Sequence, residues 1–369
     1  MARAPASDEP LPEPDRRDGA PHPRDATAVF GHAAAENDIL AALGSGKMHS
    51  GWLFTGPEGI GKATLAYRMA GTLLAQRPGD PLPAHLGLPP EHPDARLIRA
   101  GAHPRLFVLR RGIDDRGNLR SVITVEEARK LRDFFGLSAA DGGRRVVIVD
   151  PADELNPNAA NAILKLLEEP PARATLILVA HQPARLLPTI RSRCRLLRLS
   201  PLGAEDLGRA MEAIGLATDA PGPLAELAGG SVGNAVRLVA DGGLELYGDL
   251  VGLLSGIPRM DRSRAIRLAE SCAGRAEGRF GLLVDLLDLL LTRMARAGLQ
   301  GPPPEAAPGE ATLLARMAPH DRAARAWAER QATASARARQ GRAVNLDPAA
   351  LVLDMLLQIE QTARTAAAA

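Results

Sequence analysis

Residues 51–65, GWLFTGPEGIGKATL, join a short apolar run to a glycine-rich turn and the start of a helical pattern. The turn has the spacing of a phosphate-binding loop, in which a glycine, four residues, a second glycine and a lysine follow one another. Gly56, Gly61 and Lys62 occupy those positions. A strand, a glycine turn and a helix N-terminus bring free backbone N–H groups together. The stretch therefore predicts a P-loop that binds an anion.

The chain around this loop has the pattern of an α/β fold. Between residues 26 and 200, apolar runs alternate with helical periods, which predicts a parallel sheet covered by helices. The predicted strands are residues 51–55, 106–110, 145–150 and 175–180, and residues 158–169 are a predicted helix. The Pro/His/Gly-rich stretch 77–104 is expected to be a loop excursion.

Changes in composition divide the rest of the chain. Residues 1–25, with six prolines before residue 25, are expected to be a disordered tail. After residue 200 the strand signals fade, and helical patterns predict a small helical domain over 201–243 and a second one over 244–369. A Pro/Gly-rich linker at 300–309 interrupts the second domain.

Charge and cysteine content exclude several classes of protein. The formal net charge is +2, so the chain as a whole is not marked as a strong nucleic-acid binder. Cys194 and Cys272 are the two cysteines, too few for a disulfide framework or a cysteine zinc site, and they fit a reducing cytoplasm. The N-terminus has no apolar segment typical of a signal peptide. The apolar stretch 280–295 carries Asp285 and Asp288, so it predicts a buried amphipathic helix and no membrane span.

The second half of a P-loop site is predicted at RRVVIVDPADELN, residues 144–156. Its apolar strand ends in Asp150, which would contact Mg²⁺. Two residues depart from a hydrolytic site. Ala63 stands where a hydroxyl normally holds the metal, and Thr64 is one residue late. Pro151 follows Asp150 and has no base to polarise water.

Two further stretches carry a family resemblance. NPNAANAILKLLEEPP, residues 156–171, and TLILVAHQPARLLPTIRSRC, residues 175–194, together resemble the AAA+ clamp-loader family. The chain is most similar to the delta-prime branch of that family in bacterial DNA polymerase III, and the resemblance covers roughly residues 26–240. It implies an AAA+ P-loop domain over 26–200, a helical lid over 201–243 and an oligomerisation collar over 244–369. It also implies a subunit that resembles its ATPase siblings without being a motor.

The segment TIRSRC, residues 189–194, is where the resemblance implies a catalytic group. It implies that Arg193 is an arginine finger for ATP on a neighbouring subunit, with Ser192 and Cys194 shaping its loop. A guanidinium presents a fork to phosphate oxygens and stabilises charge in the transition state. From the residues alone, RSRCRLLR is better explained as an arginine-rich surface, and without the resemblance that alternative is preferred.

The predicted degenerate nucleotide site comprises Gly56, Gly59, Gly61, Lys62, Thr64 and Asp150. The resemblance implies that ATP, ADP or phosphate is held there without hydrolysis and that no cofactor is required. In GSVGNA, residues 230–235, Gly233 takes the place of an arginine that the family offers to nucleotide. The family's four-cysteine zinc module has no counterpart, since 77–104 holds only His85, His92 and His103, so no zinc or other metal is expected.

These observations favour a cytoplasmic clamp-loader subunit with no autonomous ATPase activity. Its expected partners are the motor and delta-type subunits and, through the assembled complex, a sliding clamp and primed DNA, with no membrane. The alternative is a self-sufficient AAA+ ATPase, either a motor subunit of the same machine or a remodeller. A nucleotide-binding scaffold without a clamp is the third hypothesis. The arginine-rich stretches 105–120 and 322–342 are interpreted as ordinary helix faces and loops, because acidic residues and alanines interrupt them.

Overall fold

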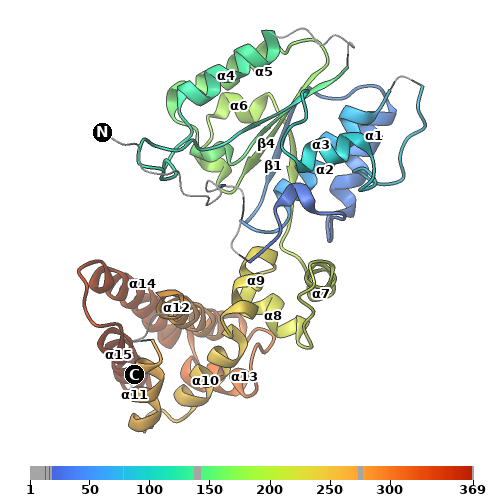
Figure 1. The fold of residues 1–369 in the computed structure, drawn as a ribbon. Coiled ribbons are helices and arrows are strands. Elements are labelled where there is room, and N and C mark those ends of the chain that lie inside the picture. The colour runs from blue at the N-terminus through green and yellow to red at the C-terminus, as the bar shows by residue number, and fades with distance from the viewer. Residues whose placement is uncertain are drawn as a thin grey trace, which may run out of the picture. The chain divides into compact units, whose positions relative to one another are not determined.

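A computed structural model of the chain describes residues 13, 16, 19–77, 79–136, 143–272 and 277–367. It divides into two compact units, which Figure 1 shows in blue to green and in yellow to red. The first unit runs to Leu202 and also includes Ser231–Gly233. The second comprises Gly203–Gly230 and the chain from Asn234 onward.

The first unit is built on a parallel sheet of five strands in the order β2-β3-β4-β1-β5. The strands are β1 (Gly51–Thr55), β2 (Leu106–Leu109), β3 (Arg145–Val149), β4 (Ala174–Ala180) and β5 (Arg195–Arg198). The predicted α/β fold and its four predicted strands are confirmed. β5 was not predicted, because its two leucines stand between arginines and only Leu197 is buried.

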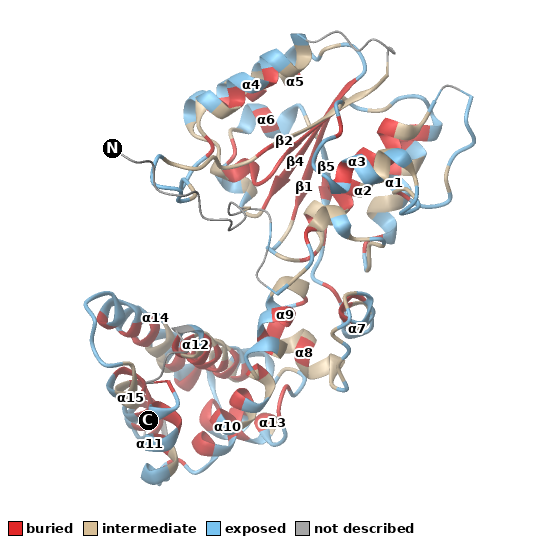
Figure 2. Cartoon of the chain, viewed as in Figure 1, coloured by how far each residue is buried: buried red, intermediate tan, exposed pale blue. Residues whose placement is uncertain are grey.

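Helices cover both faces of this sheet, because alternate side chains of each strand point to opposite faces. Trp52 and Phe54 of β1 pack with α1 (Ala33–Gly44), α2 (Lys62–Ala75) and α3 (Pro93–Arg99). Leu53 packs on the other side with α4 (Val125–Gly136), α5 (Pro157–Glu168) and α6 (Pro188–Ser192). Figure 2 shows the central strands buried between these layers. The sheet is therefore a rigid support for whatever its two edges carry.

The ordered part of the first unit begins before the predicted boundary at residue 25. Most of the predicted tail lies outside the described residues, but Pro23–Asp25 form a short 3₁₀ helix, η1. His22 is buried, accepts the backbone N–H of Arg24 and meets Tyr67 of α2 edge to face. The disorder prediction is wrong for residues 22–25, because a capped turn and an aromatic contact hold them on α2.

The stretch 77–104, expected to be a loop excursion, contains α3 and is bound to the helices beside it. The backbone N–H of Leu86 donates to Glu36 Oε1 at 2.6 Å, and that of Gly87 donates to Thr72 Oγ1 at 2.7 Å. Arg68 donates to the carbonyl oxygen of Leu86. Side chains of α1 and α2 therefore anchor the middle of the insertion.

The described residues of the second unit form helices and their connections, as predicted. Its helices are α7 (Ala204–Ala213), α8 (Pro221–Ala228), α9 (Val232–Ala240, whose first two residues belong to the first unit), α10 (Gly243–Ser255), α11 (Arg262–Glu270), α12 (Glu277–Gln300), α13 (Glu310–Met317), α14 (Asp321–Ala343) and α15 (Pro348–Ala367). The buried amphipathic helix predicted over 280–295 is the middle of α12, and Asp288 accepts from Gln331 and Ser335 of α14. Within the described ranges, no helix has the length and apolarity that crossing a bilayer requires.

A buried ionic network joins parts of this unit that composition had assigned to two domains. Arg293 of α12 donates to Glu310 Oε1 at 2.6 Å and to Glu226 Oε2 of α8 at 2.9 Å. Tyr247 of α10 donates to the same Glu310 oxygen at 2.6 Å, and the pKa of its phenol is raised, first by burial and then by Glu310. The pair between the buried Arg293 and the half-buried Glu226 thus joins the predicted lid and collar regions, which lie in one compact unit.

The collar that the resemblance implies needs an interface with other subunits, and the apolar residues of 280–291 and 346–359 are the sequence's candidates for it. In α12, Leu283, Leu287, Leu290 and Leu291 are fully buried, and so are Val352, Leu356 and Ile359 of α15. This expectation is wrong for those residues, because they form the unit's own core. Leu357 of α15, in contrast, has 41% of its surface exposed.

Candidate functional site

The predicted P-loop connects the end of β1 to the beginning of α2. Gly56, Gly59 and Gly61 have φ values of 146°, 76° and 99°, a region that L side chains rarely adopt. A Cβ on Gly56 would also lie 2.3 Å from the carbonyl oxygen of Leu199. Gly61 directly precedes Lys62, the first residue of α2. The backbone N–H groups of a helix N-terminus therefore open onto this loop, which suits an anion.

Lys62 is folded over the loop and is 3% exposed. Its Nζ donates to the carbonyl oxygens of Gly56, at 2.7 Å, and of Pro57. Burial lowers the pKa of Lys62 from 10.5 to about 8, while Asp150, Glu58 and Asp153 act in the opposite direction. The two hydrogen bonds thus tie the ammonium to the loop although burial disfavours its charge, and a phosphate group would have to draw it away from two carbonyl oxygens.

Two carboxylates follow β3 at the same edge of the sheet. Asp150 is buried, and its backbone N–H donates to the carbonyl oxygen of Leu109 at 3.0 Å. Asp153 accepts the backbone N–H groups of His181, at 3.0 Å, and Gln182, at 2.9 Å. The sequence did not identify Asp153 as a site residue, because only Asp150 stands directly at the end of the predicted strand. Its carboxylate joins the segment after Asp150 to the end of β4.

The two positions at which the sequence predicts a departure from a hydrolytic site carry neither a hydroxyl nor a base. Ala63 is the second residue of α2, and Pro151 follows Asp150 through a cis peptide bond. Glu154, the first glutamate after Pro151, lies with Oε2 3.0 Å from Nε of Arg111, and burial raises the pKa of its carboxyl group. Glu154 is therefore paired with a cation beside the site.

Residues from two distant segments also touch the loop. The N–H of Gly233 lies 3.4 Å from the carbonyl oxygen of Gly59, and both residues belong to the first unit. Gly233 thus contacts the loop through its backbone and supplies no side chain. His32 is 5% exposed, and its Nε2 lies 2.7 Å from the carbonyl oxygen of Ile60. His32 was missed, since in the sequence it was only a residue before a helical pattern.

Arg193 lies at the opposite edge of the sheet from this loop. β5 runs parallel to β1, with Arg195 beside Trp52 and Arg198 beside Thr55. Arg193 precedes β5, at the amino end of the strands, whereas the P-loop follows their carboxyl end. At about 3.3 Å per residue, the backbones of Arg193 and Gly56 are separated by roughly 15 Å or more. The structure therefore brings Gly56, Gly59, Gly61, Lys62, Thr64 and Asp150 to one edge and Ser192, Arg193 and Cys194 to the other.

The arginine segment is held by short local contacts. Arg193 Nη2 lies 2.9 Å from Glu168 Oε1, and Nη1 donates to the carbonyl oxygen of Thr189 at 3.2 Å. Ser192 Oγ donates to the same carbonyl oxygen at 3.1 Å. Burial raises the pKa of the Cys194 thiol to about 12, so this cysteine is a neutral packing residue. A Cβ added to Gly51 would lie 3.3 Å from the sulfur of Cys194.

The three histidines of the insertion have other contacts. His92 Nδ1 accepts the N–H of Asp94, and His103 Nε2 lies 3.2 Å from Asp94 Oδ1. The side chain of His85 is 81% exposed. Among the residues that the structure describes, no three His, Cys, Asp or Glu side chains are grouped to hold a metal. The absence of zinc stays a prediction.

Arginines of the stretch 322–342 have acidic neighbours. Arg325 lies 3.3 Å from Asp321, Arg337 2.9 Å from Asp354 and Arg339 3.2 Å from Asp285. These pairs agree with the interpretation of that stretch as an ordinary helix face.

Comparison with known proteins adds to this geometry. Residues 31–203 match the family model described as "DNA polymerase III, delta subunit". Over 157 residues, the chain is 43% identical to DNA polymerase III subunit delta' of Pseudomonas aeruginosa, covering 42% of this chain and 45% of that protein. It is 35% identical over 164 residues to subunit delta' of Escherichia coli, covering 44% and 46%. The chain thus spans less than half the length of these relatives.

The chain also has more distant likenesses. The tau subunit of E. coli DNA polymerase III is 28% identical over 190 residues, half of this chain and 28% of that protein. Among solved structures, a gamma subunit-related protein of Thermotoga maritima covers 88% of this chain and 100% of its own at 17% identity and a TM-score of 0.37. The T. maritima RuvB Holliday junction branch migration motor covers 73% and 76%, with 15% identity and a TM-score of 0.40. Scores this low carry no argument, but the sequence matches confirm the predicted resemblance to clamp-loader subunits, and to delta-prime within them.

Proposed function

We propose that this chain is a delta-prime-like subunit of a DNA polymerase III clamp loader. It takes part in the ATP-dependent loading of a sliding clamp onto primed DNA during replication. Its partners are the motor and delta-type subunits, and it meets the clamp and the DNA through the assembled complex. The matches to delta' and tau subunits support this proposal over the first unit, and the second unit is assigned the collar role from the resemblance alone.

The observation that carries the catalytic part is the position of Arg193. It lies at the amino end of the strands, across the sheet from the loop that would hold this chain's own nucleotide. Arg193 therefore acts on ATP bound to a neighbouring subunit, where its guanidinium stabilises charge that develops on the transferred phosphoryl group. Its exposure of 39% leaves it accessible to such a neighbour.

The chain's own site holds nucleotide or phosphate without turnover. The glycine turn and the start of α2 supply backbone N–H groups for phosphate oxygens, and Lys62 supplies a positive charge. Hydrolysis would further need a hydroxyl on Mg²⁺, a base for water and an arginine from the helical region. Ala63, Pro151 and Gly233 stand at those three places. Three losses at separate elements argue against the alternative, a self-sufficient AAA+ ATPase.

The test is ATP turnover by the purified chain, alone and mixed with motor and delta-type clamp-loader subunits, clamp and primed DNA. We expect no turnover by the chain alone, and DNA-stimulated turnover by the mixture that falls about a thousandfold at the affected site with Arg193→Ala. Arg191→Ala, which removes an exposed arginine from α6, the helix that Arg193 directly follows, is the matched control. Wild-type turnover with Arg193→Ala in an intact assembly would refute the finger. Robust turnover by the chain alone would establish the motor alternative.

A further inference from the structure

A buried histidine from a distant segment holds the backbone of the glycine-rich loop. His32, which directly precedes α1, is 5% exposed, and its Nε2 lies 2.7 Å from the carbonyl oxygen of Ile60. Because a carbonyl oxygen only accepts, Nε2 carries the proton in this contact. The side chain of Ile60 is itself in the core, with 1% of its surface exposed. The peptide that follows Ile60 is therefore fixed from both sides.

This contact sets the direction of the next backbone N–H group. The peptide between Ile60 and Gly61 is trans, so the carbonyl of Ile60 and the N–H of Gly61 point in opposite directions. With the carbonyl turned to His32, that N–H is directed away from the imidazole. The N–H of Gly233 acts in the same way on the carbonyl of Gly59. Backbone N–H groups of such a loop are the donors that cradle phosphate oxygens, so their direction decides whether the loop can bind.

A bound phosphate makes the contact with His32 more important. In the structure, Lys62 donates to two other carbonyl oxygens of the loop, and a phosphate that draws the ammonium to itself removes those two hydrogen bonds. The contacts of His32 and Gly233 use other donors and remain. Of these, the contact of Gly233 is long, at 3.4 Å, whereas that of His32 is 2.7 Å. His32 is therefore the stronger of the two remaining supports.

We propose that His32 is a positioning residue for the diphosphate group of a nucleotide. It holds the peptide between Ile60 and Gly61 so that the N–H of Gly61 faces the phosphate oxygens. This inference rests on the nucleotide-holding part of the proposed function. Because His32 acts through the backbone, its effect is the same for every ligand that carries the diphosphate group.

The test is calorimetric titration of the full chain with ADP and with inorganic pyrophosphate. His32→Leu removes the donor and keeps an apolar side chain, and we expect it to weaken the binding of both probes about tenfold. His32→Gln keeps an N–H donor on a side chain of similar reach, and we expect its affinities to stay within about twofold of the wild type. An equal loss in the two variants would mean that the imidazole only packs there, and would overturn the positioning role. A loss for ADP alone would place His32 at the adenosine and would also overturn it.

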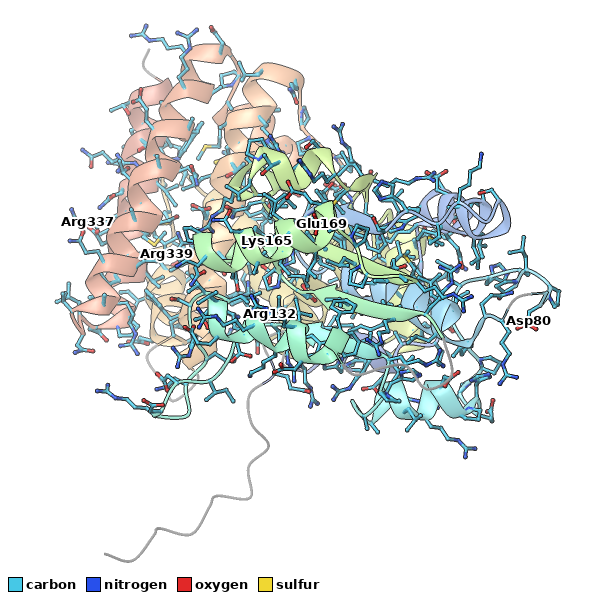
Figure 3. The ribbon with its side chains drawn as sticks, turned by 90° about the horizontal axis from the view of Figure 1, so that it is seen from above. Asp80, Arg132, Lys165, Glu169, Arg337 and Arg339 are labelled. Carbon is cyan, nitrogen blue, oxygen red and sulfur yellow. The ribbon has the colours of Figure 1, made fainter. Side chains whose placement is uncertain are left out.

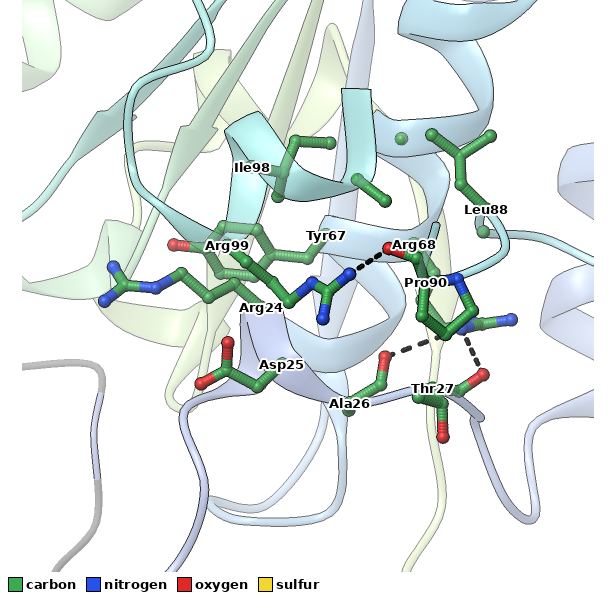
Figure 4. Close-up of a pocket in the computed structure, with 13 residues that line it drawn as sticks. Arg24, Asp25, Ala26, Thr27, Tyr67, Arg68, Leu88, Pro90, Ile98 and Arg99 are labelled. Carbon is green, nitrogen blue, oxygen red and sulfur yellow. Dashed lines mark hydrogen bonds between the residues drawn. The ribbon is translucent and has the colours of Figure 1, made fainter. Parts of the chain in front are cut away.

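Two control variants remove side chains elsewhere in the first unit. Figure 4 shows a pocket between η1, α2 and α3 that several arginines line, and Arg99→Gln removes an exposed guanidinium from it. His103→Leu removes a buried histidine that precedes β2, at the amino end of the strands. We expect both variants to bind the probes as the wild type does. A loss in Arg99→Gln or His103→Leu equal to that in His32→Leu would overturn the assignment of the effect to the loop.

A further measurement needs no variant. In the wild type, the amide proton resonance of Gly61 is expected to move downfield when pyrophosphate is added, because its N–H gains a charged acceptor. An unshifted resonance at saturation would overturn the direction inferred for that N–H. Wild-type affinities in His32→Leu would overturn the positioning role and leave the nucleotide site standing, whereas a wild type that binds neither probe would refute the site and the positioning role together.

Discussion

Arg193 and Glu168 form an ion pair, with Nη2 2.9 Å from Oε1, that joins the residue after α6 to the last residue of α5. Both side chains are about two-fifths exposed, so water screens the pair and its contribution to stability is small. Its effect is on geometry. Together with the hydrogen bond to Thr189, it limits the directions in which the guanidinium can point.

Glu168→Gln should therefore reduce the ATPase rate of the assembled clamp loader without preventing assembly. We expect a loss of about three- to tenfold, smaller than that of Arg193→Ala, because the guanidinium remains but is less well oriented. Glu169→Gln is the matched control, since Glu169 is the exposed next residue, labelled with Lys165 at the end of α5 in Figure 3. Equal rates for the two variants would show that Glu168 does not orient Arg193.

Ala63→Thr should restore a hydroxyl for Mg²⁺ in the loop. We expect ADP affinity, measured by titration calorimetry, to increase about fivefold in Mg²⁺ and to stay unchanged in EDTA. Turnover should remain absent, because Pro151 still offers no base. Ala63→Val has nearly the same shape without the hydroxyl and should show no such gain. A Mg²⁺-dependent gain in Ala63→Val would contradict this account of position 63.

Lys62 should make the stability of the first unit depend on pH in the alkaline range. Its pKa of about 8 in the folded chain lies below the ordinary 10.5, so between these values the unfolded chain binds the proton more tightly. The cost of burying the ammonium is full below pH 8 and is relieved as the pH rises from about 8 toward 10.5. Between pH 7.5 and 9.5, we expect the wild type to gain about 1–2 kcal/mol relative to Lys62→Met.

The measurement is hydrogen exchange of the β3 amides, expressed as protection factors at the two pH values. The variant supplies the control, because titrations of all other groups are common to both chains. A constant difference between the two proteins, or a relative loss by the wild type at high pH, would contradict the lowered pKa.

Glu310→Gln should destabilise the second unit strongly. It would leave the buried Arg293 guanidinium with only part of its compensating charge, and such losses amount to about 3 kcal/mol. Glu329→Gln, at an exposed position of α14, should change the unfolding free energy by no more than about 0.5 kcal/mol. Hydrogen exchange of α10 and α12 amides measures both. If Glu310→Gln lowered the protection of the α10 and α12 amides no more than Glu329→Gln does, the network would not join these helices.

The sheet was largely predictable, because buried strands of a parallel sheet are continuous apolar runs with turns at their ends. β5 escaped prediction because an edge strand needs only one buried residue, Leu197, which no run of apolar letters marks. α3 escaped because it is short and follows a proline-rich stretch, where it is held by contacts from distant helices. The N-terminal boundary was misplaced for the same reason, since the order of residues 22–25 comes from Tyr67.

The features of the candidate site likewise divide into those set by local sequence, which could be predicted, and those set by distant contacts, which could not. The spacing of Gly56, Gly61 and Lys62 within a strand–turn–helix pattern is local, so the sequence predicts the loop. Contacts between segments far apart in the chain are not local, and the sequence therefore did not reveal the hold of Asp153 on His181 and Gln182 or the contact of His32 with Ile60. The pairing of Arg193 with Glu168 depends on how α6 packs on α5, which spacing alone does not determine.

The placement of Lys62 and Arg193 on opposite edges of one sheet gives the unit a polarity, with a donor side and an acceptor side. Two copies related by a two-fold axis would place like sides together, so neither could serve the other. Only head-to-tail contact brings a donor side to an acceptor side, and such heterologous contacts build rings or open series. Under the proposed function, in which the acceptor side does not turn over nucleotide, this chain would belong at the end of such a series, giving a guanidinium to one neighbour and needing none in return.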